Sequence, residues 1–233
     1  MTVRVLHVRI EGLTASFRHP LVISGTQAVL PVPTYSSLLG MLSACAGRPV
    51  TPVETRLGFE YRFSGTDFDF QTTQRWTLEQ GRLREHRKGP GIMRRQFHTR
   101  PRLDVYVTAT NLRAEIDAPC AAPCLGRSED IAWISLVREI ELTPVHTGAV
   151  GPTLIAEGMT NAMGLPLTLA EWFQLGPFGR PRQPGSIARF IALPPTYLPD
   201  ERFEISGNYL FHPSDAHGDE DVVYLHQWYK PPK

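Results

Sequence analysis

Alternating hydrophobic and polar residues predict four strands within the first 143 residues. Residues 3–10 place Leu6, Val8 and Ile10 on one face, which is the period of a half-buried strand. Similar patterns predict strands over 57–63, 103–109 and 136–142. Between the first two strands, Thr34 is a favourable N-cap for a helix that Gly47 would end, and a short second helix is predicted over 128–134.

This order of strand, helix, strand, strand, helix, strand predicts an α+β fold of the ferredoxin-like type, which RNA-recognition domains share. We expect that domain to span residues 1–143. Residues 144–187 are rich in Gly and Pro, and short patterns at 188–193 and 222–228 predict strands. Residues 144–233 are therefore expected to hold Gly/Pro-rich loops and a small β-rich C-terminal lobe.

A long basic hairpin is predicted at about residues 70–102, between the second and third strands. An alternating polar and aromatic strand containing Trp76 leads into a Gly- and Pro-rich stretch, and the chain returns through Phe97 and His98. The segment 82–102 carries one acid and eight basic residues: Arg82, Arg84, Arg87, Lys88, Arg94, Arg95, Arg100 and Arg102. Such a hairpin can neutralise a nucleic-acid backbone and wedge beside a base, although a solvated loop is the alternative.

Charge is distributed unevenly along a chain whose formal net charge is only +1. Residues 1–110 contain 15 basic and 8 acidic residues, whereas residues 111–233 contain 9 and 15. All but three of the basic residues are arginine, whose planar guanidinium binds phosphate in a bidentate manner. The N-terminal half therefore suggests a nucleic-acid partner, and the acidic half suggests a basic protein surface or solvation.

Two predicted helix starts could bind phosphate groups through backbone amides. One begins at Thr34 and offers the hydroxyls of Ser36 and Ser37. The other follows Gly126 and offers the fork of Arg127 and the cap of Ser128. In the predicted fold both starts lie at the same end of the sheet, although simple helix capping explains either one alone.

Several of these motifs together resemble the CRISPR-associated protein family five. They are the N-terminal strand ending in glycine, FRHP at 17–20, PVPTYSSLLGML from Pro31, the hairpin insertion and LGRSED from Leu125. The resemblance covers residues 1 to about 143. It implies a modified RNA-recognition fold and a non-catalytic subunit of a type I effector complex, Cascade, expected to be of type I-B, which caps the 5′ handle of CRISPR RNA (crRNA).

The same resemblance implies the binding residues and the partners. The hairpin would be a thumb that displaces a nucleotide at the junction of handle and spacer, carrying Trp76, Arg94, Arg95 and Phe97. The implied handle-binding residues are Arg18, Ser36, Ser37, Gly126, Arg127 and Ser128. The implied partners are the crRNA, the Cascade backbone subunit, the large subunit and, through the complex, target DNA near the handle.

One branch of that family cuts precursor crRNA, so a metal-independent endoribonuclease is the alternative. Such cleavage needs a base and an acid, and this chain offers Tyr35, His86, Lys88 and His98, which do not fall in that branch's pattern. We therefore expect no enzymatic activity. A ferredoxin-like domain that binds only protein is a third possibility.

We expect no cofactor and no metal. The tract from His212 to Asp219 contains His212, Asp215, His217 and Asp219 but has no predicted secondary structure to orient them, and the pair Cys120 and Cys124 lacks a second Cys/His pair. Three cysteines, an odd number, argue against a disulfide framework. The N-terminus alternates like a strand and no apolar run approaches the roughly 18 residues of a membrane span, which predicts a cytoplasmic protein without a membrane partner.

Overall fold

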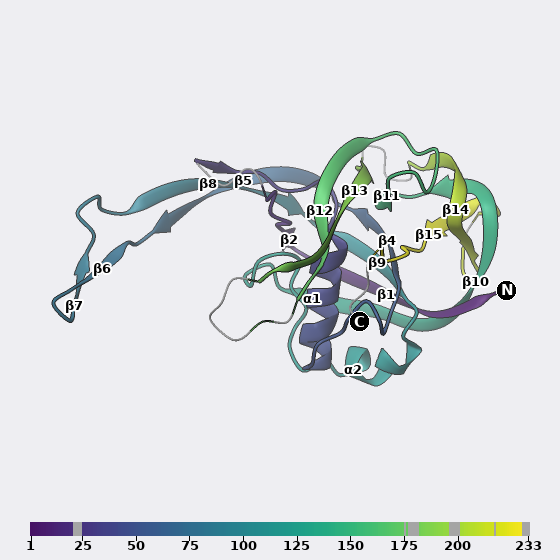
Figure 1. Ribbon diagram of the computed structural model, residues 1–233, viewed down its shortest axis with the longest axis horizontal. Coiled ribbons are helices and arrows are strands. Elements are labelled where there is room, and N and C mark those ends of the chain that lie inside the picture. The colour runs from purple at the N-terminus through teal and green to yellow at the C-terminus, as the bar shows by residue number, and fades with distance from the viewer. Residues whose placement is uncertain (21–24, 175, 177–181, 196–200, 217, 230–233) are drawn as a thin grey trace.

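A computed structural model describes residues 1–20, 25–174, 176, 182–195, 201–216 and 218–229. The protein is rich in β-structure, and its described part contains two α-helices. A rounded body holds the helices and most strands, and a thin two-stranded arm extends away from it (Figure 1). No helix in the described ranges is long and apolar enough to cross a membrane.

A six-stranded sheet forms the centre of the body, in the order β14-β15-β10-β1-β9-β4. Its strands are β1 (Val3–Gly12), β4 (Leu57–Arg62), β9 (Arg102–Val107), β10 (Ala132–Val150), β14 (Phe203–Pro213) and β15 (Asp221–Tyr224). Neighbouring strands are antiparallel, except that β15 runs parallel to β10. The four strands predicted in the first 143 residues all lie in this sheet, and the last of them, β10, is much longer than predicted.

Helix α1 (Tyr35–Ala46) packs against one face of the central sheet. The Thr34 hydroxyl accepts a hydrogen bond from the Ser37 amide, and Gly47 ends the helix with a left-handed φ of 64°. These are the predicted ends of this helix. Its buried residues join Leu6 and Val8 of β1 in the main hydrophobic core, which stabilises the helix on the sheet. The opposite face of the sheet packs a smaller hydrophobic cluster around Val5 and Tyr106.

The predicted helix over 128–134 is wrong. The helix that lies between β9 and β10 comes earlier in the chain. Residues 124–131 form a turn-rich loop, and β10 begins at Ala132. A 3-10 turn, η1 (Thr110–Leu112), leads instead into α2 (Arg113–Asp117). The alternation of Ala132, Trp133 and Ile134 suits a strand that pairs with β1, and this pairing outweighs the local capping signal at Ser128.

The arm is built from four strands of the region predicted as a hairpin. Strands β5 (Gly65–Thr73) and β8 (Gly91–Thr99) form its shaft, and β6 (Trp76–Glu79) and β7 (Arg82–Glu85) form its tip. Its first strand therefore begins at Gly65, before the predicted start at 70. Near the body, β8 also pairs with β2 (Thr14–Ala15) and β3 (Thr26–Gln27), so the foot of the arm is part of a four-stranded sheet.

The C-terminal residues contribute to two sheets. Strands β11 (Thr153–Ala156), β12 (Leu165–Phe173) and β13 (Pro184–Leu193) form a three-stranded sheet, which includes the predicted strand at 188–193. The predicted strand at 222–228 is shorter, since β15 ends at Tyr224. Strands β14 and β15 continue the central sheet beyond β10, and β10 and β12 curve around the body (Figure 1).

Candidate nucleic-acid interface

Two arginines from separate parts of the chain meet at the foot of the arm. Arg95 lies on β8, and Arg127 lies in the loop 124–131 that precedes β10. Their Nη1 atoms are 3.2 and 3.3 Å from the same atom, Oε1 of Glu129. The arginine side chains are only 13% and 14% exposed, whereas that of Glu129 is 54% exposed. Two enclosed guanidinium groups therefore share one carboxylate that stands at the surface.

The arginine pair lies among three carboxylates, those of Asp69, Glu129 and Asp130. Burial lowers the pKa of the Arg95 guanidinium, and the nearby positive charges of Arg127 and Arg18 lower it further. The Nε atom of Arg95 is buried and has no hydrogen-bond partner among the described residues. Because a buried cation needs compensating charge and hydrogen-bond acceptors, a phosphate placed here would supply both.

The loop 124–131 is held rigidly against the start of the chain. Asp130 is buried and accepts a hydrogen bond from the Thr14 hydroxyl at 2.7 Å and one from the Arg127 amide at 3.2 Å. Arg127 also donates from Nη2 to the Ser16 hydroxyl at 2.7 Å. The side chain of Arg127 is therefore positioned before any ligand arrives, which reduces the entropic cost of binding.

Gly126 is the residue that lets this loop approach the chain at Ser16. Its φ is +114°, a conformation that side chains disfavour, and a Cβ atom there would lie 2.2 Å from the Ser16 carbonyl oxygen. The Ser16 amide donates to the carbonyl of the neighbouring Leu125 at 2.8 Å. Gly126 thus acts through close backbone packing, whereas the sequence suggested a helix start. Ser128 caps no helix, and its hydroxyl donates to Glu129 at 3.3 Å.

A pocket of about 440 Å³ lies between the foot of the arm and this loop. Phe97 contributes to it from β8, and Phe68 and Phe70 contribute from β5. The guanidinium carbon of Arg94 lies 3.7 Å from the centroid of the Phe68 ring, a cation–π contact. Phe68 and Arg94 lie on one face of the arm, and Phe97 lies with Arg95 on the other, as the β5–β8 register requires. The pocket therefore offers the ring of Phe97 on the same face as Arg95, which suits an unstacked base beside its phosphate.

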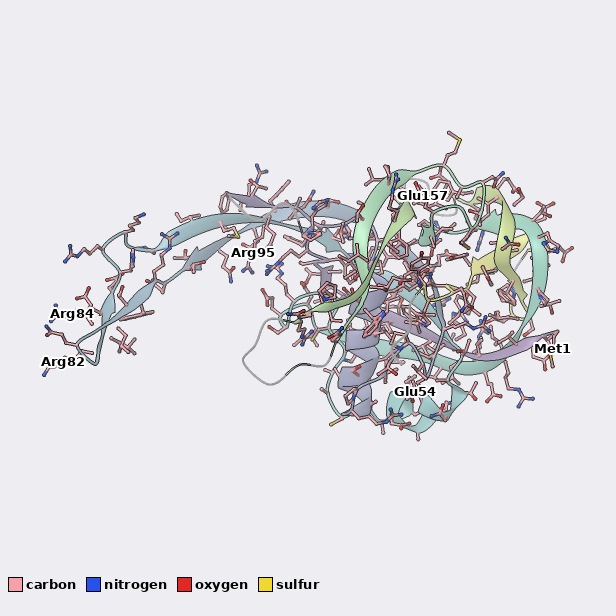
Figure 2. All side chains as sticks on the ribbon, in the orientation of Figure 1. Met1, Glu54, Arg82, Arg84, Arg95 and Glu157 are labelled. Atoms are coloured by element: carbon pink, nitrogen blue, oxygen red, sulfur yellow. The ribbon has the colours of Figure 1, made fainter. Side chains whose placement is uncertain are left out.

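The predicted basic residues of the tip lie far from this pocket, at the end of the arm. Figure 2 shows Arg82 and Arg84 there, with Arg95 nearer the body. Every side chain of β7 is exposed, as are Arg87 and Lys88 in the turn that follows. Trp76 is 62% exposed, and Leu78 and Leu83, which face each other across the tip, are 70% and 71% exposed. The tip thus presents apolar and positive side chains to the outside of this chain.

The remaining predicted residues are divided between the foot of the arm and the helix. Arg18 pairs with Val29 through an isolated β-bridge, and Arg100 lies in the turn between β8 and β9 with a φ of 48°. Ser36 and Ser37 place their hydroxyls 2.9 Å from the Thr34 hydroxyl, so they belong to the cap of α1. The structure therefore brings Arg95 and Arg127 together, and it ties the two serines to the helix.

The side chains considered for RNA cleavage are separated. Tyr35 is buried and donates its hydroxyl to the Leu154 carbonyl at 2.6 Å. His98 is buried, stacks on Phe63 at 3.8 Å, and has a pKa lowered by burial to about 4. His86 and Lys88 lie on the arm, between β7 and β8, where the Lys88 amide donates to the His86 ring.

No group of three or more His, Cys, Asp and Glu side chains in the described ranges is arranged to hold a metal ion. His217, one member of the C-terminal tract considered above, lies outside those ranges. Asp215 contacts His7 instead. All three cysteines carry free thiols.

Comparisons with known proteins find solved structures with a similar fold. No protein-family model matches the chain, and no curated protein matches it. A chain of a solved CRISPR RNA-guided surveillance complex is similar over 82% of this protein and 89% of that chain, with a TM-score of 0.58 and 19% identity. A CRISPR protein from Archaeoglobus fulgidus is similar over 95% and 98%, with a TM-score of 0.52 and 10% identity. At these identities the similarity establishes the fold, which is that of CRISPR-associated proteins.

Proposed function

We propose that this protein is an RNA-binding, non-catalytic subunit of a type I CRISPR effector complex, Cascade, and that it caps the 5′ handle of the crRNA. The observation that carries the proposal is the arginine pair at the foot of a basic arm. Arg95 and Arg127 are held in place, are largely enclosed and share a single surface carboxylate. Phosphate groups of a single strand match that arrangement.

The fold supports the same proposal. The strand order β10-β1-β9-β4, with α1 and α2 in the two crossovers, supports a ferredoxin-like assignment within the family resembled by the sequence. One similar structure is described as a CRISPR RNA-guided surveillance complex. In such an assembly the arm would be the thumb, and its exposed tip would meet the displaced nucleotide and the backbone subunit. The body would contact the large subunit, with target DNA near the handle.

Placement of the polar side chains argues for binding over cleavage. The hydroxyl of Tyr35 and the ring of His98 are enclosed in the core, and His86 and Lys88 lie on the arm, between β7 and β8. A base and an acid that flank one phosphate need to lie within hydrogen-bond reach of it. Purified protein is expected to leave precursor crRNA intact with or without a chelator. Specific cutting within the repeat would favour the nuclease alternative.

The binding test uses a labelled single-stranded RNA carrying the repeat-derived handle, titrated by fluorescence anisotropy at several salt concentrations. Arg95→Gln is expected to weaken binding and to reduce the slope of log K against log salt by about 0.7 for each lost phosphate contact. Arg189→Gln is the matched control, because Arg189 is exposed and pairs with Glu157 on a different sheet. An unchanged slope in Arg95→Gln would contradict the assignment.

A further inference from the structure

A second polar pocket, of about 390 Å³, lies on the face of the central sheet opposite α1. His7 and Arg9 of β1 alternate with the core residues Leu6 and Val8, so they point to this other face. The C-terminal part of the chain also lines the pocket, through Pro213, Asp215, Ala216 and the residues from Asp221 to Val223. Five arginines surround it: Arg9, Arg62, Arg102, Arg138 and Arg202.

The floor of the pocket is a buried chain of hydrogen bonds centred on His7. Its Nε2 lies 2.8 Å from Asp104 and its Nδ1 lies 2.7 Å from Asp215. The ring stacks on Tyr106 with centroids 4.7 Å apart. Burial lowers the pKa of His7, but hydrogen bonds and charges from both carboxylates raise it above the ordinary value. These acids are therefore occupied by their own partners.

The arginines are arranged to receive an added anion. The Asp104 side chain is 7% exposed. It accepts a hydrogen bond from Arg9 Nε at 2.7 Å and lies 3.4 Å from Arg102 Nε. The side chains of these two arginines are 33% and 43% exposed. Asp215 is 12% exposed and pairs with Arg138, which is 42% exposed. Carboxylates thus lie deep and guanidinium groups lie toward solvent.

Arg9 and Arg102 contact Asp104 through Nε, whereas Arg138 contacts Asp215 through Nη2 and the His7 ring through Nε. Because a guanidinium has five N–H donors, each of the three keeps donors for a further anion.

We propose that this pocket binds a phosphate group through the remaining N–H donors of Arg9, Arg102 and Arg138. The pocket contains five arginines against four carboxylates, Glu60, Asp104, Asp215 and Asp221, and His7 adds positive charge when protonated. A planar guanidinium matches the geometry of phosphate oxygens. The site goes beyond the proposed handle interface, because it shares no residue with the pocket that holds Arg95 and Arg127. A small nucleotide and the backbone of a nucleic acid both carry this group, and the two probes below distinguish them.

Titration calorimetry on the full chain tests the proposal with two probes, inorganic phosphate and a single-stranded uridine octamer without terminal phosphates. Arg9→Gln combined with Arg102→Gln is expected to weaken phosphate binding about tenfold or more, as expected for loss of charge-assisted hydrogen bonds. Arg4→Gln combined with Arg189→Gln removes the same charge from exposed ion pairs with Glu139 and Glu157. That control is expected to keep the affinity of the unaltered protein.

The unaltered protein provides a second readout that does not depend on the folding of a variant. Phosphate is expected to protect Arg9 and Arg102 from phenylglyoxal, measured by mass spectrometry, while Arg4 stays reactive. Binding of phosphate but not of the uridine octamer would indicate a small nucleotide or a terminal phosphate. Binding of both probes, each weakened by Arg9→Gln combined with Arg102→Gln, would indicate a backbone phosphate. Equal loss in both variants, or no protection of Arg9 and Arg102, would overturn the proposal. Arg95→Gln separates the sites, because it is expected to weaken handle binding and to leave this protection unchanged.

Discussion

Arg95 and Arg127 approach the same carboxylate oxygen of Glu129, although they lie 32 positions apart on a strand and in a loop. Each guanidinium is mostly enclosed, and the acid between them is half exposed. The glutamate therefore occupies the place that an incoming phosphate would take. This relationship makes the acid a competitor of the proposed ligand.

Glu129→Gln is accordingly expected to strengthen binding of handle RNA. An exposed ion pair contributes up to about 1 kcal/mol, so release of this competitor corresponds to an affinity gain of about two- to fivefold. Fluorescence anisotropy at fixed salt measures the gain. Glu157→Gln is the control, because that acid pairs with Arg189 away from the arm. Weaker binding in Glu129→Gln would mean that the glutamate organises the two arginines for the ligand.

Gly126→Ala is expected to destabilise the fold more than an alanine at another glycine of positive φ. The new Cβ would collide with the Ser16 carbonyl, whereas nothing lies within 4 Å of a Cβ at Gly89, whose φ is +62°. The steric conflict adds to the backbone strain, which suggests a difference of about 2 kcal/mol or more. Urea unfolding of Gly126→Ala and Gly89→Ala measures it. Equal midpoints would show that the loop 124–131 moves away without cost.

His98 is expected to make the fold sensitive to mild acid. Its pKa is lowered by burial from 6.5 to about 4, and its Nδ1 lies 2.8 Å from the Tyr61 hydroxyl. A folded pKa below the unfolded one means that the native state resists protonation. The stability is therefore complete above about pH 6.5 and decreases as the pH falls toward 4, by about 3 kcal/mol at most.

Chemical unfolding at pH 7 and pH 4.5 measures this loss in the unaltered protein and in His98→Gln. The glutamine variant is expected to lose less stability between the two pH values, since it carries no titrating group at that position. His146→Gln, at an exposed position, is expected to behave like the unaltered protein. An identical loss in all three proteins would assign the acid sensitivity to other groups.

His7 is expected to act in the opposite direction. Burial lowers its pKa, but Asp104 and Asp215 raise it above 6.5 overall. Its contribution to stability is therefore complete below about pH 6.5 and is lost as the pH rises through the folded pKa. Asp215→Asn is expected to shift the pKa of His7 downward, measured by NMR of the ring protons. A higher ring pKa in that variant would contradict the assigned contact.

Trp76 at the tip is expected to report on RNA without affecting the fold. Its indole is 62% exposed, so Trp76→Ala is expected to change the unfolding midpoint very little. Binding of RNA is expected to protect Trp76 from acrylamide quenching, and the signal is obtained as the difference from Trp76→Phe. Trp172 and Trp228 are buried, whereas Trp133 is 49% exposed, so the difference from Trp76→Phe is needed to remove the quenching of Trp133. Unchanged quenching on saturation with RNA would place the ligand away from the tip.

Sequence patterns predict an element correctly where residues close to it in the sequence determine its structure. Helix α1 has its predicted cap at Thr34 and its predicted end at Gly47, because both signals act within one turn. The same reasoning failed at 128–134. There the acids of the expected first turn bind Arg127 and Arg95, and the following residues pair with β1. A short helix gains too little from local capping to compete with these contacts.

The residues of the candidate sites were easier to predict than their geometry. Excess arginine pointed to Arg95, and the Gly-Arg-Ser motif pointed to Arg127, but no sequence period brings β8 next to the loop 124–131. His7 and Asp215 are 208 positions apart, and the sequence placed Asp215 in a tract with no predicted secondary structure to orient it. Such contacts depend on strand pairing across the whole chain, which a single sequence does not specify.

The outer half of the arm lacks an interior of its own. Strands β6 and β7 pair only with each other, and two isolated strands are marginally stable in water. Amide hydrogens in β6 and β7 are therefore expected to exchange with solvent far faster than those of β1 and β9 in the central sheet. A ligand that covers the exposed tryptophan and leucines would supply the missing layer, so order at the tip would be gained from the assembly that it joins.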